Sequence, residues 1–247
     1  MGLEIPPLPE ENLDEEKIAI VILEEKMSKE EIDQFLQNYP GLQVRHYFTE
    51  ALNGFSVKGK VRDLKKLDQV QAISLVSEVN PYYAMGEVSI EHIGGDDVRS
   101  YFDAKNQRLT GKGVTVGVID TGIDYTHPDL RGNFGGGKDF VDGDSDPMET
   151  HSRRELNTFH GTHVAGIIAA NGKLQGVAPE ATILAYRALG PGGFGTTEQV
   201  IAAIEQAMKD KVDVLNLSLG SSVNGPDMPV SIALNEAVKK GIVAVTS

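Results

Sequence analysis

The stretch that decides the fold is "VTVGVIDTGIDYTHPDL", residues 114–130. Its first seven residues form a run rich in branched apolar side chains that ends at Asp120, which is typical of a buried strand. The tripeptide Asp120-Thr121-Gly122 closes this run. An aspartate in this setting fits two chemistries: half of a pair of carboxylates that share a proton, or a carboxylate that orients a distant histidine. The tripeptide alone leaves both open.

From Thr110 onward, apolar runs of strand length alternate with helical patterns. Such alternation predicts an α/β fold with a doubly wound, mostly parallel sheet that is covered by helices on both faces. Functional residues of these sheets gather at the carboxyl ends of the strands, and Asp120 lies at such an end. The expected strands span 114–120, 181–189, 212–220 and 242–247, and the expected helices span 160–170, 196–211 and 230–241.

Residues 17–80 show a different order of patterns. Ser28 and Glu31 have the spacing of a capping box, at the start of a helix that Pro40-Gly41 ends. The order of elements is strand, helix, strand, strand, helix, strand, which is typical of small α+β ferredoxin-like modules. No convincing catalytic cluster occurs here, so we expect a binding role. The expected strands span 17–23, 42–48, 54–59 and 71–79, and the expected helices span 28–41 and 61–70.

These patterns divide the chain into four parts. A leader of residues 1–16 precedes the small domain, residues 17–80. Residues 81–109 break the periodic patterns, with Gly94-Gly95 among their glycines, and are expected to form an inter-domain linker. Residues 110–247 form the parallel α/β domain.

The composition argues against several classes of function. With 36 acidic and 23 basic side chains, the net charge of −13 would repel a nucleic-acid backbone or an anionic membrane. The sequence has no cysteine, which excludes disulfides, a thiolate nucleophile and thiolate metal sites within it. No apolar run reaches the roughly 18 residues of a membrane span. We therefore expect neither nucleic acid nor a membrane as a partner.

The setting of Asp120 favours the orienting role. A proton-sharing pair needs a second Asp-Thr-Gly or Asp-Ser-Gly element, and here the tripeptide occurs once, in an α/β context. An orienting aspartate needs a histidine, and "FHGTHVAG" supplies His160, 40 residues downstream, and His163. At the first turn of a helix, such a histidine can present one ring nitrogen to Asp120 and the other to a reacting group. We expect Gly161 and Gly166 to let this helix approach the sheet closely.

Two other interpretations of these histidines carry less weight. A zinc pair at His160 and His163 lacks both the glutamate of the His-Glu-x-x-His arrangement and any cysteine ligand. Either histidine by itself is more often structural than catalytic. The inference therefore rests on the joint pattern of Asp120 and the histidine block.

The blocks "VIDTGID" and "HGTHVAG" resemble the aspartate and histidine signatures of the subtilisin-like serine proteases, and "GVAP", "GGFG" and "NLSLG" continue the similarity. The resemblance runs from Thr110 to the end of the chain. It implies peptide-bond hydrolysis through an acyl-enzyme, with a triad in the chain order Asp, His, Ser. Asp120 would orient and stabilise the imidazolium, His160 would be the general base and later the general acid, and His163 would be structural.

The same resemblance implies a binding site for an extended substrate. Gly193, Phe194 and Gly195 match one edge strand of the family's cleft. The opposite edge, which lines the primary specificity pocket, is matched by Ser218, Leu219 and Gly220. Clamping by main-chain hydrogen bonds implies polypeptide substrates and broad sequence specificity. Ordinary turn chemistry is the alternative explanation of these glycines.

Residues 17–80 resemble the subtilisin propeptide, and "NGFSV", residues 53–57, is similar to its characteristic turn. This implies a domain that assists folding and acts as an intramolecular inhibitor. Its tail, around Val79 to Ala84, would remain in the substrate cleft. The family resemblance favours a secreted protein whose signal peptide is not part of these residues, because residues 1–17 have neither a basic nor an apolar signal region. A cytosolic protein is the alternative.

An acidic cluster in "KDFVDGDSDP" is independent of the triad. Four carboxylates crowd into eight residues, and several oxygen donors in a loop suit Ca²⁺. The segment resembles a calcium loop of some thermostable subtilases, whereas another loop common in secreted subtilisins is shortened here at "AANGKLQGVAP". A solvated acidic turn is the alternative. The candidate metal ligands are Asp139, Asp142, Asp144 and Asp146.

The resemblance also implies parts that these residues do not contain. The family's nucleophile lies in a Gly-Thr-Ser-Met-Ala block, and its oxyanion-hole asparagine in a Gly-Asn element, and neither occurs before Ser247. Ser247 continues a strand and lacks the strand-to-helix setting of a nucleophile. We therefore expect the catalytic domain to be incomplete at its C-terminus, its remaining part to be a required partner, and this chain to be inactive alone. A pseudoprotease or peptide-binding inhibitor module is the alternative.

Overall fold

The computed structural model describes residues 12–84, 93–151 and 156–247. The chain divides into two compact units. The first contains the residues up to Tyr47 together with Asn53–Glu78, and the second contains Phe48–Leu52 together with Val79–Ser247. No helix in the described ranges is long and apolar enough to cross a membrane.

The first unit is a four-stranded sheet in the order β2-β3-β1-β4, in which β1 runs antiparallel to both of its neighbours. The predicted order of strands and helices is confirmed. So is the capping box of α1: the amide of Glu31 donates to Ser28 Oγ (3.2 Å), and the amide of Ser28 donates to Glu31 Oε2 (2.7 Å). The elements are β1 (Glu16–Leu23), α1 (Lys29–Leu36), β2 (Gln43–Phe48), β3 (Gly54–Lys60), α2 (Val61–Leu64), the 3₁₀ turn η1 (Leu67–Gln69) and β4 (Ile73–Glu78).

The prediction of one helix over residues 61–70 was wrong. The apolar side chains at helical spacing are present, but they lie on two short pieces, α2 and η1. Neither piece has a side-chain cap at its start. Without a cap, the first amides of a short helix have no side-chain acceptor, and packing rather than helix propensity fixes these turns. Val61, Leu64 and Leu67 are all buried.

The second unit is built on a parallel sheet in the order β12-β10-β6-β8-β7, as predicted. A separate three-stranded sheet has the order β11-β5-β9. The elements are β5 (Pro81–Ala84), α3 (Gly95–Val98), β6 (Thr115–Asp120), β7 (Phe134–Asp139), α4 (His160–Ala169), β8 (Thr182–Arg187), η3 (Pro191–Gly193), β9 (Phe194–Thr196), α5 (Thr197–Lys209), β10 (Val214–Leu217), β11 (Leu219–Gly220), α6 (Pro229–Lys239) and β12 (Val243–Thr246).

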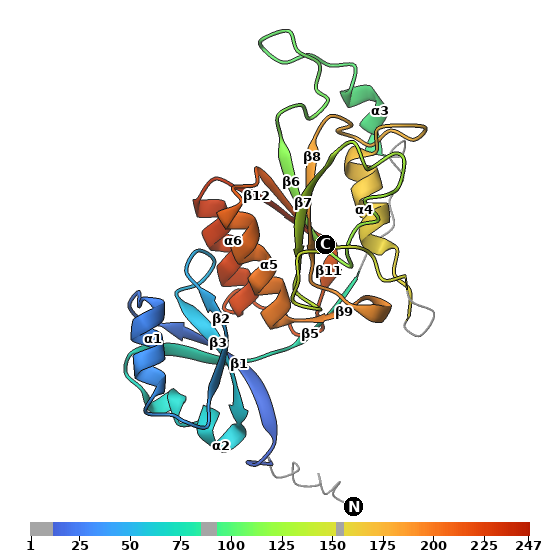
Figure 1. The fold of residues 1–247 in the computed structure, drawn as a ribbon. Coiled ribbons are helices and arrows are strands. Elements are labelled where there is room, and N and C mark those ends of the chain that lie inside the picture. The colour runs from blue at the N-terminus through green and yellow to red at the C-terminus, as the bar shows by residue number, and fades with distance from the viewer. Residues whose placement is uncertain (1–11, 85–92, 152–155) are drawn as a thin grey trace, which may run out of the picture. The chain divides into compact units, whose positions relative to one another are not determined.

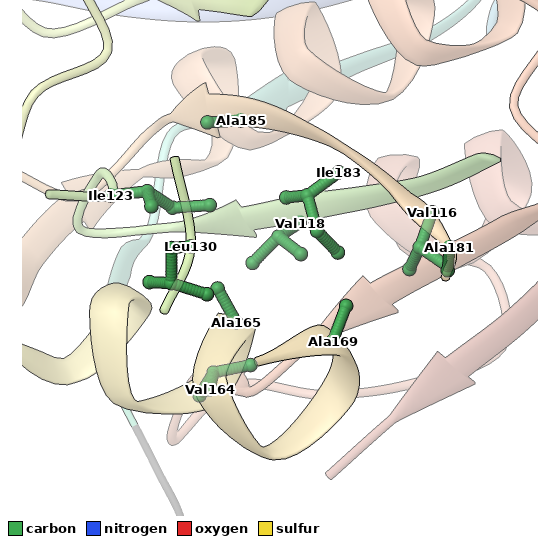
Figure 2. Packing of buried hydrophobic residues seen from close by; sticks show 10 residues of the cluster. All are labelled: Val116, Val118, Ile123, Leu130, Val164, Ala165, Ala169, Ala181, Ile183 and Ala185. Atoms are coloured by element: carbon green, nitrogen blue, oxygen red, sulfur yellow. The ribbon is translucent and has the colours of Figure 1, made fainter. Parts of the chain in front are cut away.

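Helices cover both faces of the parallel sheet: α4 lies on one face and α5 and α6 on the other (Figure 1). On the α4 face, alternate residues of β6 and β8 pack against the helix in a buried cluster (Figure 2). Because side chains alternate along a strand, Asp120 and Arg187 continue the same face at the carboxyl ends of β6 and β8. The cluster consists of Val116, Val118, Ile123, Leu130, Val164, Ala165, Ala169, Ala181, Ile183 and Ala185.

The edge strand β7 was not predicted. Its sequence, "FGGGKD", has three glycines in place of an apolar run. Gly137 adopts a φ of 156°, and a Cβ there would lie 1.9 Å from the carbonyl oxygen of Ala185 on β8. The glycine is needed because the two backbones approach so closely. Because glycine has a low strand propensity, this strand cannot be predicted from its composition.

Candidate active site

Asp120 and His160 meet at the carboxyl end of β6. The imidazole Nδ1 of His160, the first residue of α4, lies 2.8 Å from Asp120 Oδ1. The aspartate side chain is 1% exposed, whereas the histidine side chain is 20% exposed. The amide of Thr121 also donates to Asp120 Oδ1 (2.7 Å). A buried carboxylate thus holds one ring nitrogen of a histidine that remains partly open to solvent, which is the arrangement of an oriented general base.

The start of α4 approaches the end of β6 so closely that only glycine fits. A Cβ on Gly161 would lie 2.1 Å from the carbonyl oxygen of Gly122 and 3.1 Å from the Asp120 side chain. The prediction for Gly161 is therefore confirmed. The prediction for Gly166 was wrong, because a Cβ there would meet no atom within 4 Å.

This difference between the two glycines predicts opposite effects of alanine. Gly161→Ala must push α4 away from β6, and we expect it to lower the free energy of unfolding by about 1–3 kcal/mol. Gly166→Ala adds a methyl group in open space within a helix and should be neutral or stabilising by up to about 1 kcal/mol. Chemical denaturation of both variants provides the measurement. Equal stabilities of the two variants would contradict the close approach at Gly161.

A buried carboxylate that was not predicted from the sequence contacts residues next to Asp120 and His160. Glu149 is 2% exposed, and its Oε1 accepts hydrogen bonds from Thr121 Oγ1 and from the amide of Thr162, each at 2.9 Å. Its Oε2 accepts from Thr158 Oγ1. The amide of Gly161 in turn donates to Thr121 Oγ1 (2.9 Å). A lone glutamate in a loop carries no sequence signal, because its partners come together only in the fold.

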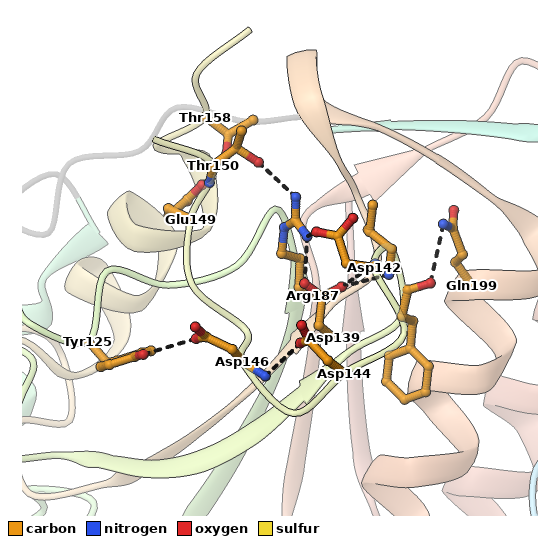
Figure 3. Close-up of polar contacts among 12 residues, drawn as sticks. Tyr125, Asp139, Asp142, Asp144, Asp146, Glu149, Thr150, Thr158, Arg187 and Gln199 are labelled. Carbon is orange, nitrogen blue, oxygen red and sulfur yellow. Dashed lines mark hydrogen bonds and ion pairs between the residues drawn. The ribbon is translucent and has the colours of Figure 1, made fainter. Parts of the chain in front are cut away.

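The acidic cluster is organised around Arg187, a buried residue at the end of β8 (Figure 3). Its guanidinium donates to Asp139 Oδ2 (2.5 Å), to Asp142 Oδ2 (2.6 Å) and to Thr150 Oγ1 (2.8 Å). Burial alone would lower the pKa of Arg187, but the two carboxylates hold that pKa above its ordinary value. These two aspartates are predicted from the sequence to bind an external cation, and the structure gives them an internal one, the Arg187 guanidinium.

The remaining two carboxylates of the loop have other partners. Asp144 Oδ1 accepts from the amide of Asp146 (2.8 Å), and Asp146 Oδ1 accepts from the hydroxyl of Tyr125 (2.9 Å). Both aspartates are exposed. Across the described ranges, no three acidic or histidine side chains are placed to share a metal ion. The four predicted ligands therefore do not converge on one point.

The two predicted substrate edges flank a strand of this same unit. β5 lies between β9 and β11 and is antiparallel to both. On one side Tyr82 pairs with Gly195 and Tyr83 with Phe194. On the other side Tyr83 pairs with Gly220. Gly193, with a φ of 78°, turns the chain into β9, and Leu219 of β11 pairs with Ala84.

Hydrogen bonds outside the β5–β9 and β5–β11 pairings fix the ends of the three-stranded sheet. The amide of Asn80 donates to Thr197 Oγ1 (2.8 Å), and the amide of Thr197 donates to the carbonyl of Asn80 (2.9 Å). Ser218, just before β11, accepts at Oγ from Asn216 Nδ2 (3.0 Å). Of the residues predicted for the two edges, Phe194, Gly195, Leu219 and Gly220 pair with β5, and Gly193 and Ser218 lie just before the pairing strands.

Two further residues named from sequence have clear positions. His163 is exposed on α4, with its amide bonded to the carbonyl of Phe159 (3.0 Å), whereas it is the ring of His160 that contacts Asp120. Ser247 follows β12, and its Oγ donates to the carbonyl of Leu219 (3.4 Å). Two side chains on β12 are largely exposed, Val243 at 59% and Val245 at 47%.

Comparisons with known proteins agree with this architecture. The sequence profile of the Subtilase family matches residues 111–247. The chain is 47% identical over 220 residues to the "Minor extracellular protease Vpr" of Bacillus subtilis, covering 83% of this chain and 27% of that protein. It is 34% identical over 209 residues to the "Alkaline protease" of Shouchella clausii, covering 83% and 51%. The "Major intracellular serine protease" of Bacillus subtilis is 43% identical over 141 residues, covering 56% and 43%.

Solved structures share the fold. The epidermin leader peptide processing serine protease EpiP of Staphylococcus aureus aligns with a TM-score of 0.66 at 23% identity, covering 94% of this chain and 59% of that one. Fervidolysin of Fervidobacterium pennivorans, a keratinolytic enzyme related to subtilisin, aligns with a TM-score of 0.65 at 22% identity, covering 94% and 39%.

The chain belongs to the subtilase family of serine proteases. It spans between about a quarter and about half of the length of these curated relatives.

Proposed function

We propose that the chain is part of a secreted serine endopeptidase that cleaves polypeptides through an Asp-His-Ser triad. In this proposal Asp120 orients the imidazole, and His160 takes the proton of the attacking serine and later gives it to the leaving amine. The observation that carries the proposal is the 2.8 Å contact between Asp120 Oδ1 and His160 Nδ1. The proposal assigns the exchange of the proton with the nucleophile to the other ring nitrogen, Nε2.

The nucleophile and the oxyanion-hole donor are proposed to come from a segment that follows Ser247. Ser247 itself is a poor candidate, because it follows a strand and its hydroxyl donates to a backbone carbonyl. The edge strand β12 pairs only with β10 among the described strands. Its exposed valines provide an apolar surface that a following part of the domain would cover.

We further propose that residues 17–80 are a propeptide, residues 81–109 the processing region and residues 110–247 the first part of the catalytic domain, after a leader of residues 1–16. The support is β5, which pairs on both sides as a bound substrate would. A strand held in this way excludes other peptides and acts as an intramolecular inhibitor. The binding edges are then Gly193 to Gly195 and Ser218 to Gly220, and pairing through main chain accounts for broad specificity.

Glu205 of α5 anchors the segment Phe48–Leu52 within the second unit. Its carboxylate accepts hydrogen bonds from the amides of Thr49 (2.9 Å), Glu50 (2.8 Å) and Ala51 (2.6 Å). Burial raises the pKa of Glu205, but Lys209 and these amides outweigh it and hold the pKa below the ordinary value. The stabilisation is therefore present above the ordinary glutamate pKa and is lost as the pH falls through the lowered pKa.

The corresponding prediction concerns acid stability. Glu205→Gln should lower the free energy of unfolding at pH 7 by about 1–3 kcal/mol, and the difference from the wild type should shrink as the pH is lowered towards 3. Unfolding measured between pH 3 and pH 7 tests this. The control is Glu236→Gln, which removes only a surface ion pair with Lys239. Parallel pH curves for Glu205→Gln and the wild type would refute the anchor.

Calcium binding by the acidic loop is a separate proposal with narrower support. Arg187 already neutralises Asp139 and Asp142, so Asp144 and Asp146 are the carboxylates left for a cation. A calcium titration followed by thermal unfolding tests it. A rise in the melting temperature that Asp144→Asn weakens would support a cation site. An unchanged melting temperature would leave Arg187 as the counter-ion of the loop.

The alternative function is a pseudoprotease or a peptide-binding inhibitor module. Retention of both Asp120 and His160 in hydrogen-bonding geometry favours the protease, because a pure binder needs neither. Peptide hydrolysis tests the choice: a C-terminally extended form that supplies the serine block should cleave a peptide substrate, whereas the 247-residue chain should not. The secreted location is supported by the extracellular protease among the relatives, although an intracellular one also matches.

A further inference from the structure

Glu149 contacts the residues on either side of His160. Its Oε2 accepts from the hydroxyl of Thr158, two residues before the histidine. Its Oε1 accepts from the amide of Thr162, two residues after it. The same Oε1 accepts from the hydroxyl of Thr121, the residue that follows Asp120. One buried carboxylate therefore joins the end of β6 to the first turn of α4.

All three partners of Glu149 must donate to it. Thr121 Oγ1 accepts from the amide of Gly161 (2.9 Å), so its own proton is free for Glu149. Thr158 Oγ1 likewise accepts from the amide of Thr150 (3.1 Å). Each partner is therefore a donor, and both carboxylate oxygens of Glu149 act as acceptors.

The start of α4 needs this support. Its N-cap residue, Phe159, makes no side-chain hydrogen bond to the helix. The amides of Gly161 and Thr162 are instead bound by Thr121 Oγ1 and Glu149 Oε1. These two bonds tie the first turn of α4 to the strand that carries Asp120, and they fix the distance across which Asp120 and His160 interact. Helix capping is here supplied by a distant residue.

We propose that Glu149 is a positioning residue of the catalytic site: its Oε1 sets His160 in hydrogen-bonding register with Asp120 through Thr121 and Thr162. The role deepens the proposed protease function, since it concerns the same histidine. In this role Glu149 does not touch the substrate. The essential atom is Oε1, which holds both β6 and α4 and which glutamine retains.

The test is the downfield proton resonance of the His160 imidazole bonded to Asp120, recorded on the 247-residue chain and assigned by its loss in His160→Ala. Glu149→Ala should abolish the resonance. Thr121→Val, which removes the hydroxyl without changing size, should also abolish it. Glu149→Gln and Thr121→Ser should retain it. Each variant is checked for folding by its thermal transition, so that Thr121→Val decides the matter if Glu149→Ala does not fold.

Asp129→Asn is the matched control. Asp129 is a buried carboxylate that accepts from the amides of Lys173 and Leu174 (3.0 Å each), just beyond the other end of α4. This variant should lose stability and keep the resonance. Retention of the resonance in a folded Glu149→Ala, or its loss in Asp129→Asn and Glu149→Gln alike, would overturn the positioning role.

Turnover provides a second readout that separates this inference from the proposed function. In a C-terminally extended, active form, Glu149→Ala should lower kcat about 10- to 100-fold with KM within about twofold, because a misplaced base affects the chemical step. Glu149→Gln should recover most of kcat. A parallel rise in KM with kcat unchanged would overturn the role. An inactive wild-type extended form would refute the protease proposal and leave the resonance test unaffected.

Discussion

His160→Ala should nearly abolish peptide hydrolysis by a C-terminally extended form of the protein. In the proposed mechanism nothing then removes the proton from the attacking serine, whereas the proposed substrate edges, Gly193 to Gly195 and Ser218 to Gly220, are unchanged. We expect kcat to fall about a millionfold with little change in KM; this magnitude is the one known for the triad histidine of subtilisin itself, rather than one derived from the distances here. Steady-state kinetics on a peptide substrate provide the measurement.

Two further variants show whether the loss belongs to the Asp120-His160 pair. Asp120→Asn should lower kcat about 10⁴-fold, and combining it with His160→Ala should cost little more than His160→Ala alone, because the two residues act as a unit. His163→Ala is the control, since its side chain is exposed and the ring bonded to Asp120 is that of His160. A loss with His163→Ala comparable to that with His160→Ala would contradict the assignment.

Arg187→Met should be the most damaging substitution for stability. It leaves the buried carboxylate of Asp139, 3% exposed, without its counter-charge. Removing one partner of a buried ion pair typically lowers the free energy of unfolding by about 3–5 kcal/mol, which corresponds to roughly 10 °C in Tm for a domain of this size. Chemical and thermal unfolding measure both quantities.

A double variant tests the cause of this loss. When Asp139→Asn is added to Arg187→Met, no buried charge is left unpaired, so we expect the stability to recover in part. Lys239→Met is the surface control: its pair with Glu236 is exposed, and its loss should cost no more than about 1 kcal/mol. Similar losses in Arg187→Met and Lys239→Met would mean that the buried ion pair does not hold the loop.

Local hydrophobic periodicity predicted the strands and the helix that carry the candidate site, but it did not predict the long-range polar contacts. The run ending at Asp120 and the helix starting at His160 have strong apolar patterns, and the packing of β6, β8 and α4 follows from them. Arg187 and Glu149 have no such pattern. Their partners lie between 9 and 48 residues away and are brought together only by the fold.

Glycines account for two wrong predictions: the strand β7 was missed, and Gly166 was assigned a close contact that it does not make. The glycines of β7 hid a strand, because close backbone contact with β8 outweighs their low strand propensity. Gly161 and Gly166 look alike in sequence, yet only Gly161 faces the neighbouring backbone. Sequence spacing places both residues on one helix but does not specify which of them meets β6. In the acidic loop, the sequence did not reveal that two of the four predicted calcium ligands, Asp139 and Asp142, bind Arg187.

Covalent labelling with a fluorophosphonate probe tests the central claim most directly, because the probe reacts only with a serine activated by its triad. We expect no labelling of the 247-residue chain, labelling of a C-terminally extended form after the β5 strand is displaced, and loss of that labelling in His160→Ala. Labelling of the 247-residue chain itself, or equal labelling of the extended form with and without His160, would contradict the claim.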